Sequence, residues 1–195
     1  DDRLAIVDYD ETARLALPPT RGADVDAIRE AVAALKADGS TNGEAGLRRA
    51  YEMIDRMRRA GALNQIAIFS DGDFNIGLDR AGDIRALVES ERAKGVSLNV
   101  VGVGLGNLND RILQSIAQHG DGVAAYMGDL LDARRVFDDL AAGKGRPFAR
   151  DVKIELEFNP RLVGAWRLLG YETRPQAREG FEDDQADSGV ITVGR

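Results

Sequence analysis

Short apolar runs alternate with amphipathic stretches from the start of the chain to about residue 142. The apolar runs are continuous and partly β-branched, which is typical of buried strands. They predict strands at residues 3–7, 65–69, 96–103 and 123–127. Apolar positions spaced by three and four residues predict helices at residues 24–36, 47–57, 79–94, 109–118 and 129–142. Strands that alternate with helices of this length indicate a Rossmann-like α/β fold, with a mainly parallel sheet covered on both faces.

Two segments depart from this alternation. Residues 12–17 alternate between apolar and polar side chains and follow the first strand closely, so we expect an antiparallel hairpin that Pro18-Pro19 ends. Beyond residues 143–147, Val152 to Phe158 alternates strictly, which predicts an antiparallel strand with a return strand at 163–171 and a further strand at 190–193. We therefore expect one α/β domain at residues 1–145 and a small β-rich unit at residues 146–195.

Composition excludes several classes of function. The 195 residues contain no cysteine, which removes disulfides, zinc–thiolate sites and thiol nucleophiles. The net charge of −7 argues against nucleic acid as a partner. No apolar run reaches the roughly 18–20 residues that a membrane-spanning helix needs, so no membrane insertion is expected from this chain.

Two polar loops hold the candidate chemistry. Thr41 lies in the loop Gly39-Ser40-Thr41-Asn42-Gly43 before a helix, and Asp71 follows the strand at 65–69. Ligands of such sheets bind beyond the carboxyl ends of the strands, where both loops are expected. A hydroxyl and a carboxylate are oxygen donors suited to Mg²⁺, with Mn²⁺ or Ca²⁺ as alternatives. The competing interpretation is that Ser40 or Thr41 caps a helix and Asp71 accepts hydrogen bonds from turn amides.

At these residues the sequence resembles the von Willebrand factor A domain family. Gly39-Ser40-Thr41-Asn42 is similar to the family's second metal-site element, and Ser70-Asp71-Gly72 is similar to the third. Residues 101–104 are similar to the exit of the family's fifth strand. Residues 149–160 resemble the C-terminal part of bacterial YfbK-like members, which makes the resemblance cover nearly the whole chain.

The resemblance implies a metal-ion-dependent adhesion site rather than an enzyme. Thr41 would bind the cation directly when ligand is bound, and Asp71 would bind it directly or through water. The cation would keep one position open for an Asp or Glu carboxylate of a protein partner. Family analogy also favours the cell envelope or periplasm.

One element of the family pattern is missing from these residues. The D-x-S-x-S motif, its strand and the following helix would precede Arg3 and would supply three of the five metal-site side chains. Without that strand, two inner sheet edges would be unpaired, which favours a strand-swapped or edge-paired oligomer.

An enzyme interpretation competes with the adhesion site. Residues 4–12 resemble the first motif of haloacid-dehalogenase-type phosphatases, which use Mg²⁺. In that family Asp8 would be the nucleophile and Asp10 the general acid/base. Ser70 would bind the phosphate with its hydroxyl, and Lys94 would supply the positively charged side chain of the site.

Overall fold

The computed structural model describes residues 2–36, 42–59, 61–71, 81–104, 110–143, 147–152, 156–167 and 189–192. The chain divides into two compact units, Asp1–Arg146 and Pro147–Arg195, and each is described by itself. No helix within the described ranges has both the length and the apolar character needed to cross a membrane.

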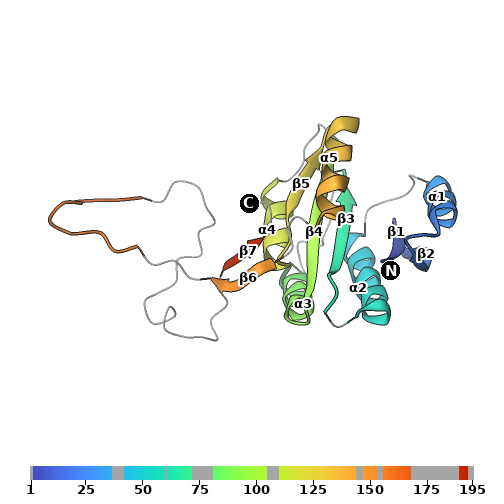
Figure 1. Ribbon diagram of the computed structural model, residues 1–195, viewed down its shortest axis with the longest axis horizontal. Coiled ribbons are helices and arrows are strands. Elements are labelled where there is room, and N and C mark those ends of the chain that lie inside the picture. The colour runs from blue at the N-terminus through green and yellow to red at the C-terminus, as the bar shows by residue number, and fades with distance from the viewer. Residues whose placement is uncertain are drawn as a thin grey trace. The chain divides into compact units, whose positions relative to one another are not determined.

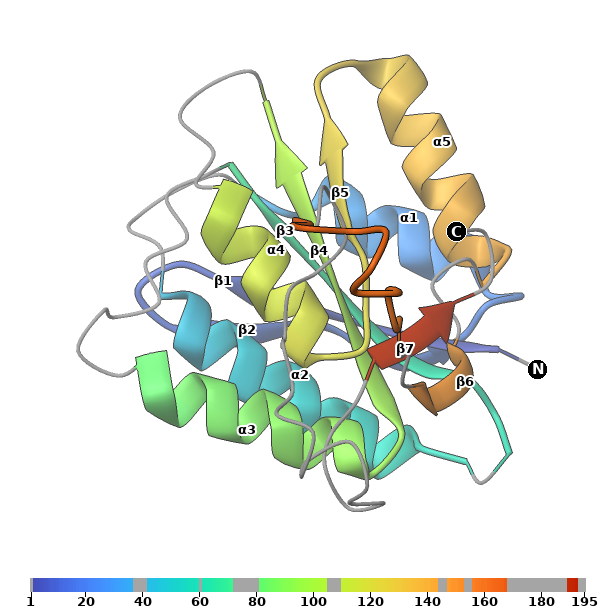
Figure 2. The same cartoon turned by 90° about the vertical axis from the view of Figure 1, so that its left-hand side faces the viewer.

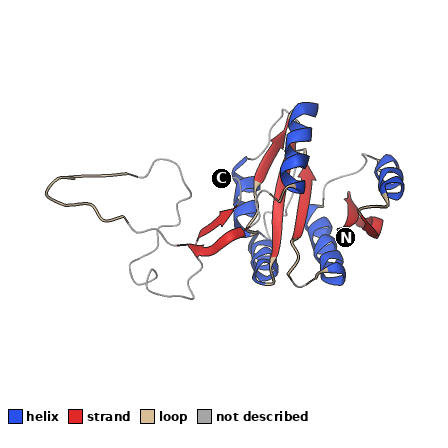
Figure 3. Ribbon diagram, in the orientation of Figure 1, coloured by secondary structure: helices blue, strands red, loops and turns tan. Residues whose placement is uncertain are grey.

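The first unit contains two strands, then two helices, and then strands and helices in alternation (Figures 1 and 3). Its strands are β1 (Arg3–Tyr9), β2 (Ala13–Arg21), β3 (Asn64–Ser70), β4 (Val96–Val103) and β5 (Ala124–Met127). Its helices are α1 (Val25–Ala33), α2 (Gly43–Met57), α3 (Ala81–Ala93), α4 (Asp110–His119) and α5 (Leu130–Ala141). The expected α/β fold is confirmed, and helix α1 ends three residues before the predicted position.

Strands β3, β4 and β5 form a parallel sheet in that order. Because side chains alternate along a strand, even-numbered residues of β3 face one side and odd-numbered residues face the other. Ile66 and Ile68 join the core cluster that includes side chains of α2, α3 and α4. On the other side, Phe69 stacks on Phe137 of α5 and Gln65 donates a hydrogen bond to the Leu140 carbonyl. Helices therefore lie on both faces of the sheet, and α3 and α4 are in front of it in Figure 2.

Strands β1 and β2 form a separate antiparallel hairpin, which confirms that prediction. The expected end at Pro18-Pro19 is wrong, because β2 continues through both prolines to Arg21. Leu4 pairs with Thr20 and Ile6 pairs with Leu17, so a single β1 residue lies opposite both prolines in a bulge. A bulge leaves the extra residue outside the hydrogen-bonded ladder, where the missing proline N–H costs nothing.

The second unit contains β6 (Pro147–Val152) paired antiparallel with β7 (Gly189–Thr192). The expected strand near 190–193 is confirmed at residues 190–192. The strand expected at 152–158 is wrong at residues 156–158, which have no strand pairing, and residues 153–155 lie outside the described ranges. Residues 163–167 of the expected return strand also lack it, and residues 168–171 lie outside the described ranges. The physical reason is that a two-residue period predicts which face of a strand each side chain lies on, but not which strand it pairs with. Strand β6 pairs with β7, which begins at Gly189. Leu156 is 70% exposed.

Candidate metal-binding edge of the sheet

Asp71 lies immediately beyond the carboxyl end of β3. Ser70, the last residue of the strand, is buried, whereas Asp71 is exposed. No ion pair joins Asp71 to another residue in the described part of the chain. The carboxylate therefore reaches solvent at the edge where parallel sheets place their ligands. Thr41 falls in residues 37–41, outside the described residues, so its place beside Asp71 stays a prediction.

Asn42 is the first described residue after Thr41, and it is the N-cap residue of α2. Its side-chain oxygen accepts a hydrogen bond from the Ala45 N–H at 3.1 Å, an N-cap that satisfies a free donor of the first turn. Its backbone N–H donates to the Asp10 carbonyl at 2.7 Å, and its Nδ2 donates to the Glu11 carbonyl at 3.4 Å. The start of α2 is thereby bonded to the turn between β1 and β2.

Tyr9, the last residue of β1, reaches the end of β3. Its hydroxyl donates to the Phe69 carbonyl at 2.6 Å, two residues before Asp71. Burial, followed by the charge of the Asp71 carboxylate, raises the pKa of Tyr9 to about 12. The phenol is therefore neutral at physiological pH and available as a donor.

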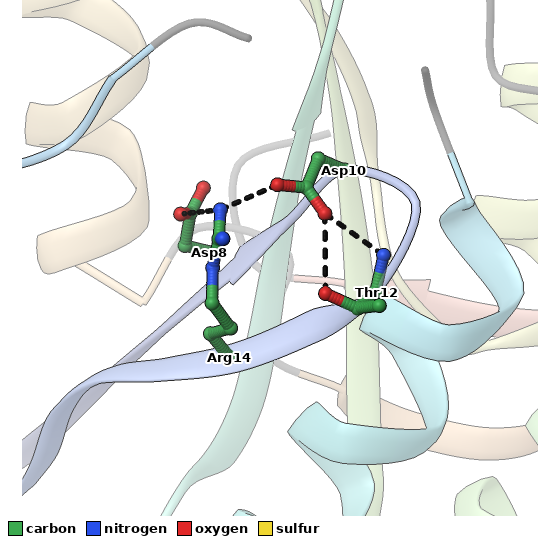
Figure 4. A network of polar contacts seen from close by, with 4 residues as sticks. All are labelled: Asp8, Asp10, Thr12 and Arg14. Carbon is green, nitrogen blue, oxygen red and sulfur yellow. Dashed lines mark hydrogen bonds and ion pairs between the residues drawn. The ribbon is translucent and has the colours of Figure 1, made fainter. Parts of the chain in front are cut away.

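Asp8 and Asp10 hold the hairpin together through Arg14 (Figure 4). The guanidinium of Arg14 pairs with Asp8 at 3.2 Å and also with Asp10. The Thr12 backbone N–H, 2.8 Å from Asp10 Oδ1, and then the Arg14 charge hold the pKa of Asp10 below its ordinary value. An ionised carboxylate that already accepts these bonds is a turn-stabilising group, and it is poorly suited to act as a general acid.

The phosphatase interpretation gains no support from the other two residues it requires. Ser70 ends β3 at its carboxyl end, whereas Lys94 precedes β4, whose first residue pairs with Asn64 at the amino end of β3. Parallel strands place these residues at opposite ends of the sheet, about 20 Å apart. Lys94 instead donates to Glu91 at 2.6 Å. A phosphate held by Ser70 would be beyond the reach of Lys94.

The residues at this edge fit a hard cation in part. An exposed carboxylate on a rigid strand end is a suitable oxygen ligand for Mg²⁺. Within the described ranges, however, no three Asp, Glu, His or Cys residues lie close enough to form a metal cluster. Asp71 can therefore supply one ligand, and further ligands must come from hydroxyl groups or from other residues.

Sequence reasoning did not assign a role to Tyr9 or to Asn42 as connecting residues. One feature of the sequence does indicate the Tyr9 contact: Gly46 lies inside a helical segment, at a position that the structure shows to be buried. Glycine at such a position indicates close approach of another group, and that group is the Tyr9 ring. Asn42 has the residue type preferred at a helix N-cap.

Comparison with known proteins assigns the fold to a family. The model of the von Willebrand factor type A domain matches residues 1–138, and the C-terminal model of the uncharacterized protein YfbK matches residues 146–195. The chain therefore belongs to the von Willebrand factor type A domain family.

The similar proteins are longer than this chain. It is 38% identical over 194 residues to the uncharacterized protein YfbK of Escherichia coli K12, covering 100% of this chain and 34% of that protein. A von Willebrand factor type A structure from Catenulispora acidiphila shares 22% identity, with a TM-score of 0.59, over 72% of this chain and 33% of that one. A mussel byssus protein, proximal thread matrix protein 1, solved with zinc in its metal-ion-dependent adhesion site, shares 21% identity over 71% of this chain and 34% of its own, with a TM-score of 0.53. The chain thus spans about a third of the length of these proteins.

Proposed function

We propose that this chain is part of a protein-interaction module that captures a partner's Asp or Glu carboxylate through a divalent cation. Asp71 and Thr41 are the ligands that these residues contribute, and Mg²⁺ is the cation that best suits their oxygen donors. The observation that carries the proposal is the exposed Asp71 carboxylate at the carboxyl edge of the parallel sheet. The family assignment supports an interaction module of this type.

The charge of the chain explains why a cation is needed. With a net charge of −7, the protein repels a carboxylate-bearing partner at long range. A bound divalent cation reverses the sign of the potential at the site. Binding of this kind makes and breaks no covalent bond, so the proposed module is not an enzyme.

The remaining ligands are proposed to come from a D-x-S-x-S motif outside these 195 residues. The zinc-occupied adhesion site in the mussel byssus protein supports a metal at this place in the fold. The zinc in that protein does not identify the cation of this chain. The oxygen donors proposed here favour Mg²⁺, with Mn²⁺ or Ca²⁺ as alternatives.

The open coordination position can be tested with Mn²⁺ in the full-length protein. Bound Mn²⁺ that keeps an exchangeable water enhances the relaxation of water protons, and a carboxylate that replaces this water lowers the enhancement. We expect enhancement with the wild type, a decrease on adding acetate or a short Asp-containing peptide, and little enhancement with Asp71→Asn.

Asp129→Asn is the matched control for the loss of one negative charge. Asp129 follows β5 at the same end of the sheet and caps α5, accepting hydrogen bonds at 2.8 Å from the N–H groups of Leu131 and Asp132. Asn is also a good N-cap, so the helix is preserved. Equal Mn²⁺ binding by Asp71→Asn and wild type would refute the assignment of Asp71.

A further inference from the structure

Tyr9 contacts β3, which ends just before Asp71, and α2, which begins just after Thr41. Its ring lies against Gly46 of α2, and its hydroxyl is bonded to Phe69 of β3. Yet β1 pairs only with β2 among the described strands, so no backbone ladder joins the hairpin to the parallel sheet. The Tyr9 side chain therefore connects two sheets that no strand pairing joins among the described residues.

The Tyr9 side chain packs so closely on α2 that Gly46 has no space for a side chain. A Cβ added at Gly46 would lie 2.7 Å from Cγ of Tyr9 and 2.9 Å from its Cβ, closer than real Cβ contacts come. Gly46 is buried and lies four residues after Asn42. Because a helix is rigid over one turn, the position of the ring determines where the first turn of α2 lies.

The contact with β3 fixes the end of the strand before Asp71. The Phe69 carbonyl accepts the Tyr9 hydroxyl on one side, and the Phe69 ring stacks on Phe137 with centroids 5.5 Å apart. Asp71 is exposed and makes no ion pair with described residues, so its position depends on the backbone that leads into it.

We propose that Tyr9 is a positioning residue of the metal site, which holds the end of β3 and the start of α2 at a fixed separation. It touches neither cation nor partner, and it acts through Asp71 and through the start of α2. This inference rests on the proposed function. Groups that orient metal ligands commonly change metal affinity by about tenfold to a hundredfold when they are lost.

Mg²⁺ affinity of the full-length protein, measured by titration calorimetry, tests this role with two matched variants. Tyr9→Phe keeps the ring against Gly46 and removes the bond to Phe69. Tyr51→Phe also removes a hydroxyl, but a buried one on α2 that has no hydrogen-bond partner among the described residues. We expect Mg²⁺ affinity to fall about tenfold with Tyr9→Phe and to stay at the wild-type value with Tyr51→Phe. A purely structural role would lower the melting temperature and leave the affinity of the folded protein unchanged.

Asp71→Asn, titrated alongside, separates this inference from the proposed function. If Asp71→Asn abolishes Mg²⁺ binding and Tyr9→Phe binds as the wild type does, the positioning role is wrong and the proposed function stands. If Asp71→Asn binds as the wild type does, both are wrong. Should Tyr9→Phe not fold, Gly46→Ala disturbs the same contact from the helix side, and wild-type affinity in that variant would overturn the positioning role.

Discussion

At the scale of single residues, the hydroxyl groups of the half-buried Tyr9 and the buried Tyr51 differ in their surroundings. The Tyr9 hydroxyl donates to the Phe69 carbonyl. Within the part of the chain that the structure describes, the Tyr51 hydroxyl, on a residue only 3% exposed, has no hydrogen-bond partner. Oε2 of Glu91, a residue 5% exposed, has none there either. Burial, followed by the charge of Glu91, raises the pKa of Tyr51 as well. A polar group buried without a partner costs about 1–3 kcal/mol, so the two hydroxyls should contribute with opposite sign to stability.

Hydroxyl deletion tests this difference. We expect Tyr9→Phe to lower the free energy of unfolding by about 1 kcal/mol, because a hydrogen bond is lost and the Phe69 carbonyl is left without this donor. Tyr51→Phe should leave the free energy unchanged or raise it slightly. Urea denaturation of both variants measures the two values, and a larger loss in Tyr51→Phe than in Tyr9→Phe would contradict the account.

The raised pKa of Tyr9 predicts a dependence on alkaline pH. The pKa of Tyr9 is about 12 in the folded state, against the ordinary value of 10.0 expected in the unfolded chain. The stability that Tyr9 contributes is therefore complete below pH 10 and is lost as pH rises from 10 towards 12. In a metal-free spectrophotometric titration, Tyr9→Phe should remove a late-ionising phenol, whereas loss of a phenol that ionises near pH 10 would show that Tyr9 is exposed.

At the scale of elements, the turn from α4 into β5 lies directly against the backbone of β4. The Leu98 N–H donates to the Gly120 carbonyl at 2.9 Å, and the Asn99 side chain accepts from the Val123 N–H at 3.0 Å. A Cβ at Gly122 would lie 1.9 Å from the Leu98 carbonyl oxygen, which is backbone and cannot rotate away. Glycine is required here by space rather than by a positive φ.

Gly122→Ala should therefore destabilise the first unit strongly, by about 3 kcal/mol or more, because β4 and the turn must separate. Gly164→Ala is the control, since nothing lies within 4 Å of an added Cβ there. Thermal unfolding followed by circular dichroism compares the two. Equal melting temperatures would show that the turn does not pack on β4 as described.

A helix or strand of the first unit could be predicted from the sequence where the pattern that defines it lies within one segment. Apolar periodicity located every described helix and strand of this unit, because apolar residues recur along each at the spacing of a helix or a strand. It failed at Pro18-Pro19, where a bulge in the partner register admits proline, and at residues 152–158, where the partner strand lies near residue 190. At the candidate site, Asp71 was predicted from its place after a strand. The Tyr9 link was not, because it joins residues 60 positions apart that no local pattern relates.

At the scale of the whole molecule, the second unit carries an apolar surface of its own. Exposed large side chains gather at residues 156–167, and the rings of Phe158 and Trp166 lie 5.5 Å apart. The first unit, by contrast, carries the candidate metal edge. The metal-binding role proposed for the first unit can therefore be tested without the second unit.

Deleting residues 147–195 from the full-length protein makes that test. We expect Mg²⁺ affinity to change less than about twofold, because no proposed ligand lies in the second unit. Circular dichroism and titration calorimetry measure folding and binding in the same sample. A folded deletion variant that no longer binds Mg²⁺ would place a ligand in the second unit and contradict the proposed site.

The central claim is that Asp71 is a cation ligand at the carboxyl edge of the sheet. Isothermal titration of Mg²⁺ into the full-length wild type, Asp71→Asn and the control Asp129→Asn tests it most directly. The account predicts one Mg²⁺ bound by the wild type and by Asp129→Asn, with binding lost or weakened at least about tenfold in Asp71→Asn. Indistinguishable Mg²⁺ binding by all three folded proteins would contradict it.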